Sequence, residues 1–251
     1  MTTAVGAHLH SAYRTVVPLQ GDPHGFLQPV LVVLTLVTGL VDAFSYLVLG
    51  HVFVANMTGN VVFLAFSLAG APGFSVSASL TALAAFAVGA LVGGRIAHRY
   101  VGHRGRVLFA TVIVEVVLVG AATTVAWVHG EPYVDASQYI LIVLMGSAMG
   151  AQNASARSLA VPDLTTTVLT LTVTGISADS KLAGGPDSRI GRRLVSAGAM
   201  FLGAVIGAVV VLRGFGAGSL LIATAVLACA GVGAWFLARS NAPWVAPAGK
   251  R

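Results

Sequence analysis

Charged residues are scarce in this chain of 251 residues. Only 9% of its residues are Asp, Glu, Lys or Arg, whereas a typical soluble domain has about 25%. Hydrophobic residues make up 57%, and runs without any charge cover residues 26–41, 70–94 and 194–212. A helix needs about 20 apolar residues to cross the ~30 Å hydrocarbon core of a bilayer. The composition therefore predicts an all-α integral membrane protein that crosses the bilayer several times.

The chain also has a single cysteine, Cys229, which lies in an apolar segment. One cysteine excludes an intramolecular disulfide, a CxxC redox pair and a cysteine-based metal site. The sequence contains no HExxH motif, no phosphate-binding loop and no Ser/His/Asp grouping, so we expect no enzyme, no cofactor and no metal centre. The net charge is +6, but most of the positive residues gather between apolar segments and no large soluble domain remains. We therefore expect the partners to be the lipid bilayer and a small molecule or ion, not nucleic acid.

The second half of the chain repeats features of the first half. Residues 54–61 read V-A-N-M-T-G-N-V, and residues 161–168 read V-P-D-L-T-T-T-V. Likewise G-A-L-V-G-G from residue 89 returns as G-A-V-I-G-A from residue 203, and L-F-A-T from residue 108 returns as L-I-A-T from residue 221. Three matches in the same order predict a duplicated unit. At the offset of the first match, 107 residues, Asp42 corresponds to Met149.

Two basic clusters decide the predicted topology. The first cluster is Arg95, Arg99, Arg104 and Arg106, and the second is Lys181, Arg189, Arg192 and Arg193. Eight apolar segments are present, at 26–49, 52–70, 75–97, 107–129, 138–159, 161–178, 194–212 and 217–238. If all eight crossed, the two clusters would lie on opposite faces and violate the positive-inside rule. If 52–70 and 161–178 enter and return, both clusters share the cytoplasmic side.

We therefore predict about six transmembrane helices plus two broken or re-entrant segments, arranged as an inverted 3+3 repeat. The alternative is that both short segments cross as ordinary helices whose Thr side chains bond their own i−4 carbonyls. Pro162, Gly50 and Gly59 argue against regular helices there. The predicted units are a cytoplasmic tail at 1–25, a first repeat at 26–129, an external linker at 130–137, a second repeat at 138–238 and a cytoplasmic tail at 239–251.

Polar residues within apolar segments are the candidates for function, because such groups are costly in hydrocarbon unless they face protein or water. The two repeated strings supply a first group of candidates for a substrate or ion pathway: Asn56, Thr58, Asn60, Asp163 and Thr165. A second group lies on the predicted crossing helices: Asp42, Ser45, Tyr46, Glu115, Gln152, Asn153 and Arg157.

Each charged candidate has a structural alternative. Asp42 could bind a proton or cation, or it could hold the next stretch of backbone in place. Glu115 has no polar neighbour for several residues on either side, so it could carry protons or bond a neighbouring helix as a neutral acid. Arg157 could pair with a carboxylate or an anionic substrate, or extend to the membrane surface. The G-x-x-x-G patterns at Gly89 and Gly203 predict close helix packing within the chain and leave a homo-oligomer open.

The longest distinctive run is residues 39–70, G-L-V-D-A-F-S-Y-L-V-L-G-H-V-F-V-A-N-M-T-G-N-V-V-F-L-A-F-S-L-A-G. This run resembles the hallmark of the YoaK-like family of bacterial inner-membrane proteins, and A-Q-N-A and L-T-T-T-V in the second half are similar to that family as well. The resemblance implies a multi-pass protein of the bacterial plasma membrane, and it supplies no substrate and no catalytic residues. The residues themselves favour a small transporter or permease over a structural or accessory membrane protein. Its transport could be coupled to protons.

Overall fold

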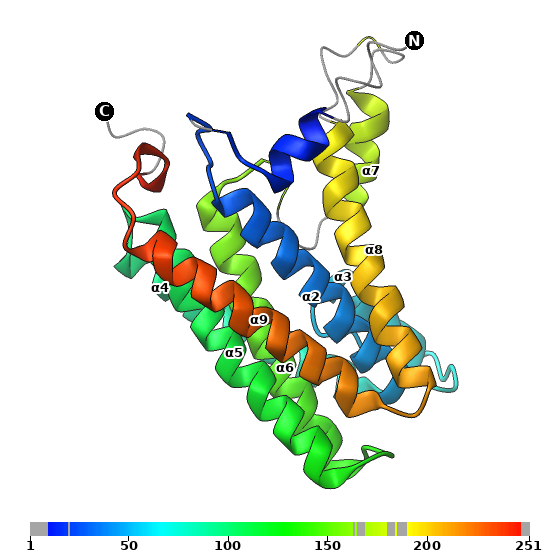
Figure 1. Cartoon of the computed structure of the whole chain (residues 1–251). Coiled ribbons are helices and arrows are strands. Elements are labelled where there is room, and N and C mark those ends of the chain that lie inside the picture. The colour runs from blue at the N-terminus through cyan, green and yellow to red at the C-terminus, as the bar shows by residue number, and fades with distance from the viewer. Residues whose placement is uncertain are drawn as a thin grey trace.

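The computed structural model describes residues 10–19, 21–162, 164, 169–179, 184 and 190–246. Within these residues the chain is helical and has no strands, which confirms the predicted all-α class. The helices shown in Figure 1 are α2 (Leu27–Val48), α3 (Met57–Leu68), α4 (Val76–Arg99), α5 (Arg104–His129), α6 (Asp135–Leu159), α7 (Leu169–Ala178), α8 (Ile190–Leu212) and α9 (Gly216–Ala238). A short 3-10 turn, η2 (Pro243–Val245), follows α9.

Five of these helices are long and apolar enough to cross a membrane, namely α2, α4, α5, α8 and α9. A sixth long helix, α6, has 25 residues and carries more polar side chains near its end. The two short helices, α3 with 12 residues and α7 with 10, fall within the segments predicted to be broken or re-entrant. At ~1.5 Å per residue they extend only about 18 Å and 15 Å, which is less than the ~30 Å core.

The long helices pack in three close pairs, α4 with α6, α2 with α8, and α5 with α9. Glycines make the first two pairs possible. A Cβ atom added to Gly89 of α4 would overlap the carbonyl oxygen of Ser147 in α6, and one added to Gly203 of α8 would overlap the carbonyl oxygen of Leu36 in α2. In lipid, where apolar surface gains nothing by leaving water, such backbone-to-backbone approach is a main source of helix association.

The described arginines of both basic clusters lie at one end of the bundle, here called the basic end. Arg104, at the start of α5, donates hydrogen bonds to the backbone oxygens of Leu159, at the end of α6, and Trp244, after α9. Arg192, in the first turn of α8, donates to the carbonyl of Pro162 at 3.5 Å. Lys181 and Arg189 of the second cluster lie outside the described residues. The described arginines of both clusters therefore share one end, as the predicted topology requires.

The connections that follow α2 and precede α6 and α9 lie at the other end of the bundle, here called the opposite end. Gln138, at the start of α6, donates to the carbonyl oxygen of Leu49 after α2 at 2.8 Å. Glu131 accepts a hydrogen bond from the N–H of Gly216 at the start of α9 at 2.9 Å. Consequently α2 and α6 run in opposite directions, as do α4 and α8, and α5 and α9.

The segment between α2 and α4 enters the bundle and returns to the same end. Its entry and exit lie close together, because the His51 ring nitrogen is 3.0 Å from the carbonyl oxygen of Gly73. Between these points, Val54 and Ala55 reach the side chain of Asp42, inside α2. The segment thus begins and ends at the same end of the bundle, which is the course that the predicted re-entrant path of 52–70 requires. At the basic end, α7 lies beside the first half of α8 (Figure 1), where Asp179 and Arg193 form an ion pair at 2.9 Å.

Candidate functional site

A cavity of about 690 Å³ separates the first turn of α3 from the first turn of α7. Asn56 and Thr58 line it from the first polar string, and Thr170 lines it from α7. Its apolar wall includes Phe63 of α3 and Phe86 of α4. The two predicted site residues of the second string, Asp163 and Thr165, lie outside the described residues. The described part of the chain therefore brings one polar string and the start of α7 to the same space.

Asp42 positions the backbone that leads to this cavity. Its Oδ1 atom accepts hydrogen bonds from the N–H groups of Val54 at 3.1 Å and Ala55 at 2.9 Å. The carboxyl group is buried, and its Oδ2 atom has no hydrogen-bond partner among the described residues. The hydroxyl of Ser45 donates to the carbonyl oxygen of Asp42 at 3.2 Å. This geometry matches the structural alternative for Asp42, the carboxyl group that holds the next backbone stretch in place.

Asn60 has a similar backbone role and does not line the cavity. Its side-chain oxygen accepts from the N–H of Phe53 at 2.9 Å, and its amide nitrogen donates to the carbonyl oxygen of Phe53 at 2.6 Å. A buried, unpaired peptide group costs about as much as a lost hydrogen bond, so this pairing lets an irregular segment enter the bundle. The prediction that Asn60 belongs to a substrate pathway therefore has no support in its contacts.

An aromatic cluster lies between the cavity and the opposite end. Phe63, which lines the cavity, stacks on Phe53 at 5.7 Å and on Phe74 at 5.2 Å between ring centroids. Tyr46 stacks on Phe53 at 4.9 Å, and its ring also meets the His51 ring edge-on. The Tyr46 ring, predicted as a pathway residue, is thus part of the layer that covers the cavity on this side.

A second set of predicted residues forms a polar layer inside the bundle. Gln152 of α6 donates to the hydroxyl of Thr38 in α2 at 2.9 Å. Thr111 of α5 donates to the hydroxyl of Ser155 in α6 at 2.6 Å. Glu115 lies one turn beyond Thr111 on α5, and Gln152 lies about one turn before Ser155 on α6. Because these two helices run in opposite directions, Glu115 and Gln152 lie at about the same depth.

Glu115 is completely buried. Neither of its carboxyl oxygens, nor the side-chain oxygen of Gln152, has a hydrogen-bond partner among the described residues. An ionised carboxylate without a partner costs several kcal/mol in such surroundings. The partner on a neighbouring helix that the sequence led us to expect for Glu115 is therefore not found in the described part of the chain.

A groove of about 960 Å³ runs between α4 and α6 toward the basic end. Asn153 and Arg157 line it from α6, and Phe86 closes its inner end, so it adjoins the cavity between α3 and α7. The Asn153 amide donates to the carbonyl oxygen of Met149, one turn earlier, at 2.9 Å. Arg157 is exposed and lies at the basic end of the groove.

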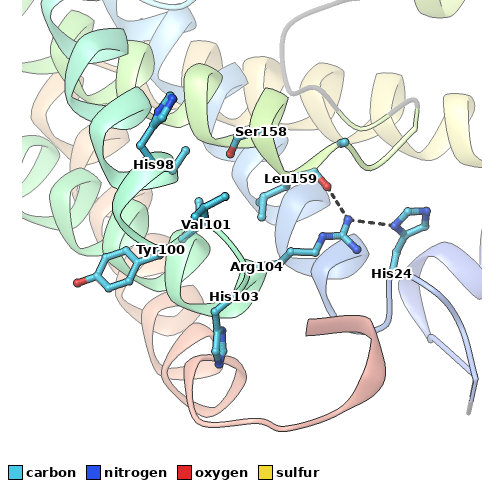
Figure 2. A pocket seen from close by; sticks show the side chains of 12 residues that line it. His24, His98, Tyr100, Val101, His103, Arg104, Ser158 and Leu159 are labelled. Carbon is cyan, nitrogen blue, oxygen red and sulfur yellow. Dashed lines mark hydrogen bonds between the residues drawn. The ribbon is translucent and has the colours of Figure 1, made fainter. Parts of the chain in front are cut away.

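Arg104, which sequence reasoning treated only as a marker of sidedness, ties several segments together at the basic end (Figure 2). Its guanidinium donates to His24 Nδ1 at 3.1 Å and to the carbonyl oxygens of Pro23, Leu159 and Trp244. These contacts come from before α2, from α6 and from η2. The spacing of residues in the sequence gives no signal for them, because the partners are 55 to 140 positions away.

Arg104 and His103 line one pocket at the basic end (Figure 2), and His103 caps the start of α5. Its Nδ1 atom accepts a hydrogen bond from the N–H of Arg106 at 3.1 Å, so the ring is neutral in this arrangement. Burial, together with the positive charge of Arg106, lowers the pKa of His103 below its usual value. The cap is therefore retained at neutral pH.

A family model described as "Protein of unknown function (DUF1275)" matches residues 30–233. The chain belongs to this family. It is also similar to the UPF0700 transmembrane protein YoaK of Bacillus subtilis (strain 168), with 34% identity over 150 residues. That alignment covers 59% of this chain and 65% of the relative, slightly under two thirds of the relative's length. No solved structure matches the chain.

These comparisons confirm the resemblance predicted from residues 39–70. Together with the apolar helices, they show a multi-pass membrane protein of the YoaK-like family. They name no substrate and no functional residue, so the activity has to be argued from the cavity and its surroundings.

Proposed function

We propose that the protein is a small transporter or permease, with its substrate site in the cavity between α3 and α7. The observation that carries the proposal is that two short helices, α3 in the segment that enters from the opposite end and α7 beside α8 at the basic end, line one cavity with their first turns. Irregular backbone at membrane depth is tolerated where it is buried in protein or lines a water-filled space. Discontinuous helices that meet at such a space are a recurring way to build a transport site.

If the two halves form an inverted repeat, they can exchange conformations, and the site then opens alternately to the two sides of the membrane. A Cβ atom on Gly39 of α2 would meet the backbone of Met200 and Ala204 in α8, and one on Gly150 of α6 would meet the backbone of Phe86 and Ala90 in α4. The two glycines are 111 positions apart in the sequence, and each partner of Gly39 lies 114 positions after the corresponding partner of Gly150. We take the two contacts as equivalent, with the helices of one half running opposite to those of the other.

This equivalence changes one detail of the repeat. It aligns G-L-V-D-A at residues 39–43 with G-A-Q-N-A at residues 150–154, so Asp42 corresponds to Asn153 and not to Met149. The polar string itself keeps its offset of 107, which requires a shorter connection after α6 than after α2. The carboxyl group of the first half then has an amide as its counterpart, and charge remains unequal between the halves.

The sidedness of the proposal follows from the positive-inside bias. We place the basic end in the cytoplasm of a bacterial cell, with both chain termini on that side and the 130–137 linker outside. The aromatic cluster around Phe63 then covers the site on the external side. Glu115, buried and unpartnered, is the group that we propose to take up and release a proton during the cycle.

The test begins with purified protein and a panel of small solutes. A solute that binds the native state raises its unfolding temperature, so thermal shifts select a substrate candidate. We expect that solute to show counterflow in proteoliposomes of the wild type. Thr58→Val should lower counterflow by about tenfold or more, the effect expected when a buried substrate group loses its hydrogen bond. Thr124→Val, at an exposed position on α5 that bonds its own helix, is the matched control and should leave flux unchanged.

Proton coupling is tested separately with Glu115→Gln. This variant keeps the shape of the side chain but replaces the carboxyl group with an amide that cannot take up or release a proton. Uptake driven by a pH gradient should therefore be lost while counterflow continues. Equal loss of both activities with unchanged unfolding temperature would contradict a role confined to coupling.

The alternative is a structural or accessory membrane protein in which the polar string only locks helices together. The backbone contacts of Asp42 and Asn60 favour it. The two readings differ in the access of water to the cavity. In a Cys229→Ser background, a cysteine placed at Thr58 should react with small charged thiol reagents if the cavity belongs to a transporter. A Thr58→Cys protein that resists these reagents from both sides, with no counterflow for any solute, would establish the accessory function instead.

A further inference from the structure

The groove between α4 and α6 has the dimensions of one lipid chain in one leaflet. It extends along α4 from Phe86 to His98, a rise of about 18 Å at ~1.5 Å per residue. Half of the ~30 Å hydrocarbon core is about 15 Å. The groove is open to the outside of the bundle, where Leu91 is 61% exposed. We propose that it binds an anionic phospholipid of the leaflet at the basic end, with the phosphate at Arg157 and one acyl chain reaching Phe86.

The charged end of the groove fits a phosphate group. Arg157 and His98 lie there together with the hydroxyl-bearing Ser158, and no acidic side chain of the described residues lines the groove. His98 Nδ1 donates to the carbonyl oxygen of Gly94 at 2.8 Å, so a neutral His98 has no second N–H for a phosphate and Arg157 is the donor there. A guanidinium offers two parallel N–H groups to phosphate oxygens. Basic pockets between helices on the cytoplasmic side suit anionic lipid head groups for the same reason.

The rest of the groove fits an acyl chain. Its walls are made by small apolar side chains of Ala87 and Ala90 in α4 and Ala154 in α6, with Leu91 at the edge. A second groove, of about 510 Å³ between α2 and α9, provides a comparison. It is lined by residues such as Val33, Val226 and Cys229, and by no charged side chain of the described residues. Of these two grooves, the one between α4 and α6 combines an apolar wall with a cation at the end nearest the head groups.

The lipid would lie next to the proposed transport site, because Phe86 lines both the groove and the cavity between α3 and α7. Lipid binding there depends only on the groove and its charge. It would stand if the protein moved no solute at all.

The test measures lipid binding to the full-length protein in detergent by native mass spectrometry. The probes are phosphatidylglycerol, which is anionic, and phosphatidylcholine, which is zwitterionic with the same chains. We expect the wild type to retain phosphatidylglycerol preferentially. Arg157→Gln should weaken phosphatidylglycerol binding by about fivefold, the effect expected for one cation near an anionic lipid surface, and leave phosphatidylcholine binding unchanged.

Two further variants and one competitor separate the possible sources of binding. Arg99→Gln removes an exposed charge of α4 that does not line the groove, so it should have less than about twofold effect if binding is local. Ala87→Leu narrows the groove and should weaken both lipids. Glycerol 3-phosphate, which has the phosphate without chains, should not compete. Equal effects of Arg157→Gln and Arg99→Gln, or competition by glycerol 3-phosphate as strong as by the lipid, would overturn the proposal.

Discussion

At the scale of single residues, Asp42 shows how a buried carboxyl group can act through its oxygen and not through its charge. One oxygen accepts both the Val54 and Ala55 N–H groups. We predict that Asp42→Asn, which keeps an oxygen for these donors, unfolds near the wild-type temperature in detergent. Asp42→Ala leaves two buried donors unpaired and should lower the free energy of unfolding by ~1–3 kcal/mol for each of them.

The two substitutions also separate the two hypotheses for Asp42. If Asp42→Asn folds normally but loses proton-coupled flux, the charge has a function in addition to the backbone contacts. If Asp42→Ala is as stable as the wild type, the hydrogen bonds to Val54 and Ala55 do not support the re-entrant segment.

Sequence reasoning identifies such residues better than it identifies their partners. Asp42, Asn60 and Glu115 stand out because a polar group in an apolar segment needs a reason to be there. Their partners depend on how the chain turns back. Asn60 pairs with Phe53, seven positions earlier, and Arg104 bonds Trp244, 140 positions later. Phe53 lies before the start of α3, so a helical spacing of seven does not predict its contact with Asn60, and a separation of 140 residues has no local signal at all. Only the folded structure reveals these partners.

At the scale of helices, glycines determine how closely α4 approaches α6 and how closely α8 approaches α2. We predict that Gly89→Ala and Gly203→Ala are each destabilising by ~1–3 kcal/mol, because the new Cβ would overlap a backbone oxygen of the neighbouring helix and force the pair apart. Thermal unfolding in detergent measures the effect. The matched controls are Gly94→Ala in α4 and Gly198→Ala in α8, where no heavy atom lies within 4 Å of the added Cβ.

The controls should be neutral or slightly stabilising, since Ala is favoured over Gly in a helix by ~0.5–1 kcal/mol. A similar loss of stability at all four glycines would contradict this explanation. It would show that these positions contribute helix flexibility and not close packing. The G-x-x-x-G spacing predicted this packing from sequence, although it left the partner helix open. The pairing of α4 with α6 could not be read from spacing because those helices are separated by α5.

Also at this scale, Arg104 joins three segments that are distant in sequence. We predict that Arg104→Ala increases hydrogen exchange in residues 21–26 and 240–246, because Pro23, His24 and Trp244 lose their shared donor. Arg106→Ala is the control, since the Arg106 side chain is exposed two positions away. Equal exchange in the two variants would show that these segments are held by other contacts.

At the scale of the whole molecule, the arrangement of charge predicts one orientation in the membrane. The described members of both basic clusters share one end of the bundle, and the loop with Glu131 is at the other. The positive-inside bias acts on such short connections. We predict that single cysteines at Val101 and Asn241, in a Cys229→Ser background, react with a membrane-impermeant thiol reagent only when the cytoplasmic side is exposed.

Cysteines at Ala71 and Val134 should give the opposite result, reacting in intact cells. Ala71 is the more informative of the two, because it follows α3, the helix that returns to the side from which its segment entered. An ordinary crossing of 52–70 would place Ala71 on the same side as Asn241. Labelling of Ala71 and Val134 from one side, with Val101 and Asn241 from the other, is therefore the result that a re-entrant segment requires. Labelling of Val101 and Ala71 from the same side would contradict the arrangement of α3 and α4, and with it the cavity between α3 and α7.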